Sequence, residues 1–138
     1  MKYALLFPGQ GSQEVGMLGA LAAAYPVIDS TFAEASAALG YDLAALVKSG
    51  PAEELNRTQR TQPALLAASV AVARLWQSLG LPAPSSLAGH SLGEYSALVV
   101  AGALDFADAL KLVELRGELM QTAVPQGVGA MAAVIGVD

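Results

Sequence analysis

Apolar and polar positions along the chain form blocks that predict mainly helices, with a few short strands between them. Apolar residues at helical spacing, together with helix start and stop signals, mark seven predicted helices at 15–24, 26–39, 43–47, 51–55, 62–79, 92–104 and 106–122. Short apolar runs predict strands at 2–7, 85–90 and 131–137, the first of them buried. Strands that alternate with helices are typical of an α/β fold with parallel strands, which is the fold class we predict.

Residues at the ends of the predicted helices support these boundaries. Asp42 and Asp105 each precede a helix and can accept a hydrogen bond from a backbone N–H of its first turn. Gly40 and Gly80 each follow a helix and are suited to the left-handed conformation that ends one.

Two further features of the helical region carry predictions. Trp76 lies among apolar residues of the helix at 62–79, so we predict that it is a core aromatic residue. The stretch 56–62 is the most polar part of the chain and holds two of its four arginines. We predict that this stretch is a solvated connection between helices.

Composition excludes several kinds of protein. The chain has no cysteine and one histidine, so neither a disulfide nor a metal site is expected. Its net charge of −5 and scattered basic residues argue against a nucleic-acid partner. Every long apolar run is interrupted by charge, and the amino terminus lacks a signal-peptide pattern, so we predict a cytoplasmic protein without a membrane partner.

The content of charged residues is low, at 14%, against 54% hydrophobic residues. An ordinary soluble domain carries about 25% charged residues. Two explanations stay open: the helices are simply rich in alanine, or part of the apolar surface packs against more protein than these 138 residues.

A glycine-rich loop at 9–13 follows the first predicted strand and precedes a helix. This order is typical of dinucleotide-binding proteins, but Glu14 stands where the third glycine of that motif belongs. A carboxylate at that position would face the pyrophosphate, so we do not expect a nucleotide site.

The strongest candidate for chemistry is Ser91 in the pentapeptide 89–93, which has the spacing of a nucleophile elbow. Gly89 and Gly93 would allow the sharp turn and the close approach of strand and helix that expose the serine. A second interpretation is a capping box, in which Ser91 caps the helix and Glu94 returns the hydrogen bond.

A serine nucleophile needs a base within hydrogen-bond reach, and His90 is the only histidine. Because His90 is adjacent to Ser91 on the turn, its side chain should leave the backbone in another direction. We therefore expect His90 either to support the elbow or to be a packed residue. These residues then contain a nucleophile without a base.

Four motifs together resemble the malonyl-CoA:acyl carrier protein transacylase family, which includes the acyltransferase domains of fatty-acid and polyketide synthases. They are FPGQGSQ at 7–13, TQPA at 61–64, GHSLGEY at 89–95, and RG at 116–117 followed by GVGAM at 127–131. The resemblance covers the whole chain, with the motifs in order and at compatible spacing.

The resemblance implies a role for each matching position. Ser91 would accept a malonyl group from malonyl-CoA as an ester and pass it to the phosphopantetheine thiol of an acyl carrier protein. The backbone N–H groups of Gln10 and Leu92 would form the oxyanion hole, and Arg116 would bind the malonyl carboxylate. His90 and Gln62 match positions that line the site. Coenzyme A thioester is then a substrate, and no permanently bound cofactor is expected.

The resemblance also implies a domain organisation. Residues 1–124 correspond to the amino-terminal part of a large α/β hydrolase-like subdomain, and residues 125–138 to a linker and the first strand of a small ferredoxin-like subdomain. The family's catalytic histidine lies further downstream. We therefore expect this chain to be the amino-terminal part of the enzyme, with little activity unless the carboxy-terminal part joins it as a partner. The alternatives are a serine hydrolase and a non-catalytic fragment in which Ser91 is only a helix cap.

Overall fold

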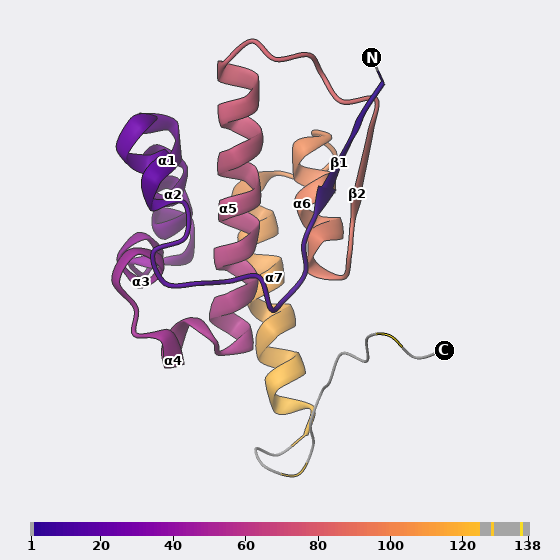
Figure 1. Cartoon of the computed structure of the whole chain (residues 1–138). Helices are drawn as coiled ribbons and strands as arrows, with labels where there is room; N and C mark the ends of the chain where they lie inside the picture. The colour runs from indigo at the N-terminus through magenta and orange to yellow at the C-terminus, as the bar shows by residue number, and fades with distance from the viewer. Residues whose placement is uncertain (1, 125–127, 129–135, 137–138) are drawn as a thin grey trace.

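A computed structural model describes residues 2–124, 128 and 136 of the chain. The elements in chain order are β1 (Ala4–Phe7), α1 (Gly19–Ala24), α2 (Pro26–Leu39), α3 (Leu43–Ser49), α4 (Ala52–Leu55), α5 (Thr58–Ser78), β2 (Ser86–Gly89), α6 (Leu92–Val100) and α7 (Phe106–Thr122). The long helix α5 runs through the centre, with α1 to α3 on one side and the two strands on the other (Figure 1). The predicted α/β class is confirmed, in a mostly helical form; the strand predicted at 131–137 lies outside the described residues.

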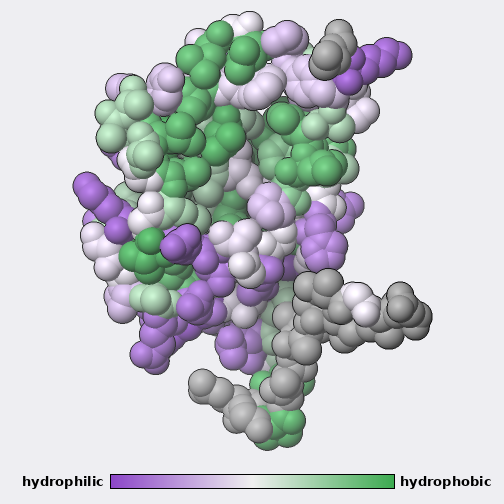
Figure 2. All heavy atoms as spheres, viewed as in Figure 1, coloured by the Kyte–Doolittle hydropathy of each residue, from purple (hydrophilic) through white to green (hydrophobic). Residues whose placement is uncertain are grey.

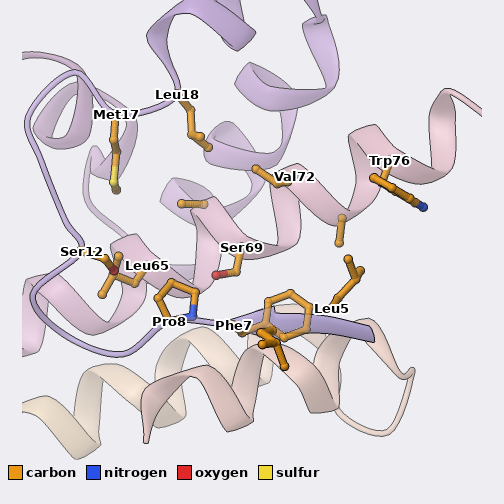
Figure 3. Close-up of a pocket in the computed structure, with 13 residues that line it drawn as sticks. Leu5, Phe7, Pro8, Ser12, Met17, Leu18, Leu65, Ser69, Val72 and Trp76 are labelled. Carbon is orange, nitrogen blue, oxygen red and sulfur yellow. The ribbon is translucent and has the colours of Figure 1, made fainter. Parts of the chain in front are cut away.

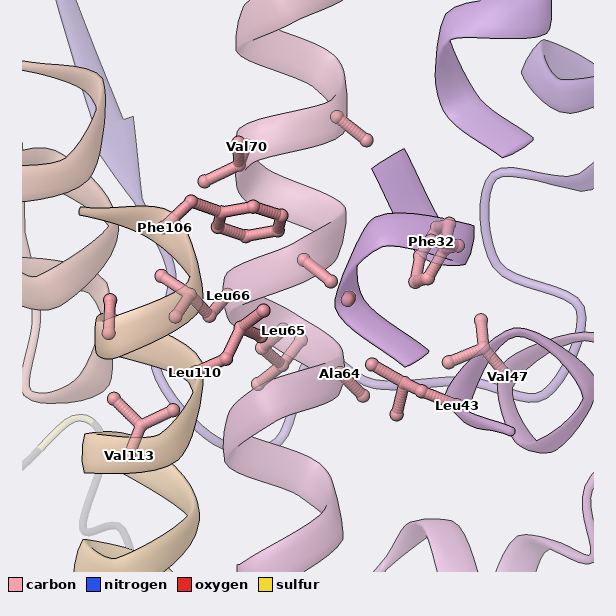
Figure 4. Close-up of a cluster of buried hydrophobic side chains, with 14 of the residues drawn as sticks. Phe32, Leu43, Val47, Ala64, Leu65, Leu66, Val70, Phe106, Leu110 and Val113 are labelled. Carbon is pink, nitrogen blue, oxygen red and sulfur yellow. The ribbon is translucent and has the colours of Figure 1, made fainter. Parts of the chain in front are cut away.

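The hydrophobic core is formed by helices rather than by the sheet. Side chains of α5 fill the space between α7 on one side and α2 and α3 on the other (Figure 4). The largest fully buried apolar side chains of the core are Ile28, Leu43, Leu55, Leu66, Leu92, Leu110 and Val113. Since each of these side chains contributes about 1.5–3 kcal/mol when buried, the helical layer is the main source of stability.

The sheet contains two parallel strands in the described part of the chain, with Ala4 opposite Ser86 and Phe7 opposite Gly89. Helix α6 packs against both strands and covers one face of the sheet. Phe7 is buried, but Leu6 is 77% exposed. The prediction that the first strand is buried is therefore wrong, because only one of its faces is covered within the described residues.

Helix α1 begins four residues later than the predicted start at residue 15. Gly16 has φ 84° and Leu18 has φ 62°, so both lie in the left-handed region that a right-handed helix excludes. The turn is held to α3 by the Gly16 N–H, which donates to the Val47 carbonyl at 2.7 Å.

Most of the polar stretch 56–62 is the start of α5, which corrects the prediction of a solvated connection: the helix begins at Thr58, and the exposed Asn56 and Arg57 link it to α4. The Thr61 hydroxyl donates to the Leu55 carbonyl at 2.6 Å, and both Thr61 and Gln62 are fully buried. Arg60 forms ion pairs with Glu54 and with Glu114 of α7. The buried polar groups of Thr61 and Gln62 bind to other protein groups, as buried polar groups must.

The predicted ends of several helices are confirmed. Asp42 accepts a hydrogen bond from the Ala45 N–H, and Asp105 accepts one from the Asp108 N–H. Gly40, at φ 76°, ends α2. Helix α7 has the predicted bounds, whereas α6 ends at Val100, four residues before the predicted end.

Trp76 is not a core residue, contrary to the prediction. Its indole N–H donates to the Pro82 carbonyl at 2.9 Å, and its ring lies beside that of Tyr3, with the centroids 5.5 Å apart. It is half-buried and covers the loop that leads from α5 to β2. An indole is often found at the edge of a core, where its ring is packed and its N–H can donate to an acceptor.

Gly117 allows α7 to contact the backbone of α5 directly. A Cβ atom at this position would lie 2.6 Å from the Gln59 Cα and 2.7 Å from the Thr58 carbonyl oxygen. These distances leave no room for a methyl group. The adjacent Arg116 is thereby held against the first turns of α5.

We predict that Gly117→Ala lowers the free energy of unfolding by about 1–3 kcal/mol, because the two helix backbones must separate. Gly19→Ala is the matched control, since a Cβ there meets no atom within 4 Å. Denaturant unfolding of both variants measures the difference. Equal stability of the two variants would contradict the close contact.

Candidate active site

Ser91 stands on a sharp turn between β2 and α6. Its backbone has φ 54° and ψ −109°, a conformation rare for a residue with a side chain, and Leu92 is the first residue of α6. The Ser91 side chain makes no capping hydrogen bond and is exposed. The capping-box interpretation is therefore wrong, and the hydroxyl is free to face a substrate.

Gly89 and Gly93 make the turn possible by close backbone contacts. A Cβ on Gly89 would lie 2.0 Å from the Gly93 carbonyl carbon, and a Cβ on Gly93 would lie 2.1 Å from the Phe7 carbonyl oxygen. The His90 N–H donates to the same Phe7 carbonyl at 3.1 Å. The end of β1 and the start of α6 are thus pressed together beneath Ser91.

The loop after β1 brings Gln10 to the same place. A Cβ on Gly9 would lie 3.0 Å from the His90 Nδ1 and 3.8 Å from the Ser91 Cβ, so this loop touches the turn. Gln13 fixes the loop by donating to the Asn56 side chain at 2.8 Å. No described residue accepts a hydrogen bond from the backbone N–H of Gln10 or of Leu92.

Arg116 joins α7 to the turn through its guanidinium group. Its Nη2 donates to the Ser91 Oγ at 3.1 Å, and its Nη1 donates to the Gln62 Oε1 at 2.7 Å. The Gln62 Nε2 in turn donates to the Gln10 Oε1 at 3.4 Å. Four residues predicted from the sequence, on four separate segments, are therefore brought together.

The charge of Arg116 has no carboxylate beside it in the described part of the chain. The other three arginines form ion pairs: Arg57 and Arg60 with Glu54, and Arg74 with Glu34. Glu114, one of the two glutamates that lie two residues from Arg116 along α7, binds Arg60 instead. An uncompensated, half-buried guanidinium next to a serine is suited to bind the carboxylate of a ligand.

His90 does not contact the Ser91 hydroxyl in any hydrogen bond among the described residues. Its side chain is exposed and its Nδ1 lies against Gly9. This agrees with the expectation that the side chain leaves the turn in another direction. The neighbouring Arg116 is the group that contacts the Ser91 Oγ.

Three residues next to the site were not predicted as site residues. The Tyr95 ring lies 5.7 Å from the Arg116 Cζ, the Thr58 Oγ1 accepts from the Gln10 Nε2 at 3.5 Å, and the Met120 Sδ lies 3.4 Å from the Gln62 Nε2. Tyr95 belongs to the serine motif, and Met120 lies one helical turn after Arg116, at the spacing that shares a helix face. Thr58 carried no comparable signal, because its stretch was assigned to a loop.

Two of the apolar depressions on the described surface bear on the position of the site. One, of about 290 Å³, lies between β1 and α5 and includes Phe7, Val72 and Trp76 (Figure 3). Figure 2 shows apolar residues gathered over this face of the molecule. The other lies along α7, where Leu115 and Leu119 are exposed beside Arg116. The second of these adjoins the site, because Arg116 is part of its lining.

Within residues 2–124, 128 and 136, no cluster of histidine and acidic side chains could hold a metal ion. Across the same residues, no helix combines the length and the apolar character that a membrane span needs.

A serine on a strained turn before a helix, with unoccupied backbone N–H groups nearby, is the arrangement of enzymes that form acyl esters on serine. Residues 4–137 match the family model of the acyl transferase domain, and the chain belongs to this family. The chain is 68% identical over 137 residues to the malonyl CoA-acyl carrier protein transacylase of Escherichia coli K12, and 52% identical to that of Bacillus subtilis 168. The resemblance inferred from the motifs is confirmed.

The matches cover 99% of this chain but 44% of the Escherichia coli protein, so the chain spans less than half the length of this relative. Solved structures give the same result. An acyl carrier protein S-malonyltransferase from Vibrio cholerae has a TM-score of 0.89 and 69% identity, covering 92% of this chain and 42% of that one. A malonyl-transacylase in complex with a type II polyketide acyl-carrier protein has a TM-score of 0.90 and 67% identity, covering 92% and 41%.

The backbone conformation of Ser91 is strained for a residue with a Cβ atom but not for glycine. A side chain at φ 54° with ψ −109° is strained by about 1–3 kcal/mol. We predict that Ser91→Gly is about 1 kcal/mol more stable than Ser91→Ala, after subtracting the greater entropy of glycine in the unfolded chain. Thermal or denaturant unfolding of the two variants tests this, and a lower stability of Ser91→Gly would contradict the strain.

Proposed function

We propose that the protein is an acyltransferase that moves a malonyl group from coenzyme A, through an ester on Ser91, to the phosphopantetheine thiol of an acyl carrier protein. The observation that carries the proposal is the contact between the Ser91 Oγ and the Arg116 guanidinium, which has no carboxylate partner among the described residues. The names of the relatives, malonyl CoA-acyl carrier protein transacylases, support the same substrates.

The reaction follows from the groups around Ser91. Its Oγ attacks the thioester carbonyl of malonyl-CoA, the C–S bond breaks, and the proton taken from the hydroxyl passes to the departing coenzyme A thiolate. In the second half, the carrier thiol attacks the ester carbonyl and the C–O bond breaks. The proton of that thiol returns to the Ser91 Oγ. Each half passes through an oxyanion, for which we assign the backbone N–H groups of Gln10 and Leu92 as donors.

Arg116 provides the selectivity in this proposal. In a malonyl ester of Ser91, the free carboxylate is three bonds from the Oγ, and the guanidinium that already contacts this oxygen is within reach of it. The two parallel N–H groups of a guanidinium bind a carboxylate bidentately. An acetyl group has no carboxylate and gains nothing from Arg116.

The proton of Ser91 needs an acceptor. His90 is turned toward Gly9, so we assign to it a supporting role at the turn. We propose that the acceptor is a histidine outside these 138 residues, as the resemblance implies. Gly89 and Gly93 support the turn through the contacts that exclude a Cβ.

The finer description of the fold belongs to the same proposal. We assign residues 1–124 to an α/β hydrolase-like subdomain, supported by the parallel pair β1 and β2 and by the order β2, Ser91, α6. Residues 125–138, mostly outside the described part, are assigned to a linker and the first strand of a ferredoxin-like subdomain. The proposed setting is the cytoplasm, with coenzyme A thioester as substrate and no permanently bound cofactor.

A serine hydrolase shares the turn, but its reaction does not require an arginine that contacts the serine hydroxyl and has no carboxylate partner among the described residues. A non-catalytic fragment would keep Ser91 as a helix cap, and that hydrogen bond is not formed. Neither alternative accounts for the contact between Arg116 and Ser91.

We predict that incubation of the full-length natural protein with malonyl-CoA adds the mass of one malonyl group to Ser91. Intact-mass analysis and peptide mapping measure the adduct. Ser91→Ala should abolish it, whereas Ser78→Ala, at the far end of α5, should leave it unchanged. An adduct that survives in Ser91→Ala would contradict the assignment of the nucleophile.

We predict that Arg116→Ala lowers kcat/KM for malonyl transfer, which corresponds to an activation free energy raised by about 2–5 kcal/mol. The effect on acetyl transfer should be much smaller. Arg116→Lys should restore only part of the loss, because a lysine lacks the planar fork. Arg74→Ala is the control, since Arg74 is paired with Glu34. Equal losses for malonyl and acetyl transfer would show that Arg116 is structural.

A further inference from the structure

Gln62 is a fully buried polar residue whose amide oxygen and amide nitrogen both have hydrogen-bond partners. Its Oε1 accepts from the Arg116 Nη1 at 2.7 Å, while its Nε2 contacts the Gln10 Oε1 and the Met120 Sδ, each at 3.4 Å. The short bond is the one to the charged group, as expected for a charge-assisted hydrogen bond. The amide is therefore held mainly by Arg116, and it holds Arg116 in turn.

The direction of these hydrogen bonds is fixed by chemistry. A guanidinium only donates, so the atom of Gln62 that faces Arg116 must be the oxygen, and the Nε2 must face Gln10. Gln10 then accepts with its oxygen and donates through its own Nε2 to the Thr58 Oγ1 at 3.5 Å. One directed line of hydrogen bonds thus runs from Arg116 to the loop after β1.

The partner of Arg116 differs from those of the other arginines. Arg57, Arg60 and Arg74 each contact a glutamate, while in the described residues Arg116 contacts a neutral amide and a neutral hydroxyl. A glutamate at position 62 would have nearly the same shape and would pair with Arg116 permanently. The neutral amide orients the guanidinium and leaves its positive charge uncompensated.

We propose that Gln62 is a positioning residue that sets the selectivity of the site for a dicarboxylic acyl group, by orienting Arg116 without neutralising it. This inference rests on the proposed malonyl transfer. A buried glutamine that only satisfied the core would affect all acyl donors equally. Gln62 instead acts through Arg116, so its effect falls on the donor that carries a free carboxylate.

The test compares kcat/KM for malonyl-CoA and acetyl-CoA in the natural protein and in Gln62→Glu. The added carboxylate pairs with Arg116, so the malonyl carboxylate loses its charged partner and kcat/KM for malonyl-CoA should fall by about 30-fold. The value for acetyl-CoA should change by less than about threefold. Gln77→Glu is the matched control, because it makes the same change on an exposed position of the same helix. Equal losses with both donors in Gln62→Glu would overturn the inference.

Gln62→Met is a second variant that keeps a similar volume and adds no charge. It removes the acceptor of the Arg116 Nη1, so malonyl transfer should fall about tenfold while acetyl transfer is retained. A folded Gln62→Met with unchanged malonyl transfer would overturn the inference even if Gln62→Glu does not fold. Melting curves establish which variants are folded.

The background of Arg116→Ala separates this inference from the proposed function. There, Gln62→Met should cause no further change in the malonyl-to-acetyl ratio, since Gln62 acts through the guanidinium. A further selective loss in this background would overturn the inference. If Arg116→Ala is selective and the Gln62 variants are not, the inference alone fails. If Arg116→Ala affects both donors equally, the proposed function fails first.

Discussion

The close backbone contact between α6 and the end of β1 is the constraint on which the site depends. Gly93 touches the Phe7 carbonyl, and Gly89 touches Gly93, at distances that exclude any side chain. This contact places Ser91 on a strained, exposed turn, and it brings the loop after β1 next to that turn. The strain is maintained because the helical core, which includes the fully buried Leu92 directly after Ser91, supplies the stability.

A second close contact controls the charge at the site. Gly117 sets α7 against the first turns of α5, and the neighbouring Arg116 then reaches both Gln62 and Ser91. Arg60 binds Glu114, one of the two glutamates that lie two residues from Arg116 along α7, and so keeps that carboxylate away from the site. Within the described residues, packing and ion pairing together leave one guanidinium without a counter-charge next to the serine.

Much of this could be predicted from the sequence, and the failures have a common physical origin. Asp42 and Asp105 are local signals, so the helices that they cap were predicted well. The start of α5 was not predicted, because polar residues such as Gln62 normally lie on the solvent-exposed surface. Here Gln62 is buried and binds Arg116. The capping box at Ser91 failed for a related reason: the backbone conformation that exposes the hydroxyl prevents it from reaching the helix N–H groups.

The line of hydrogen bonds from Thr58 through Gln10 and Gln62 to Arg116 contains hydroxyl, amide and guanidinium groups. Amide and hydroxyl side chains neither gain nor lose a proton between about pH 5 and pH 9. The neutral side chains of Thr58, Gln10 and Gln62 therefore present the same donors and acceptors to Arg116 over the range in which cells operate.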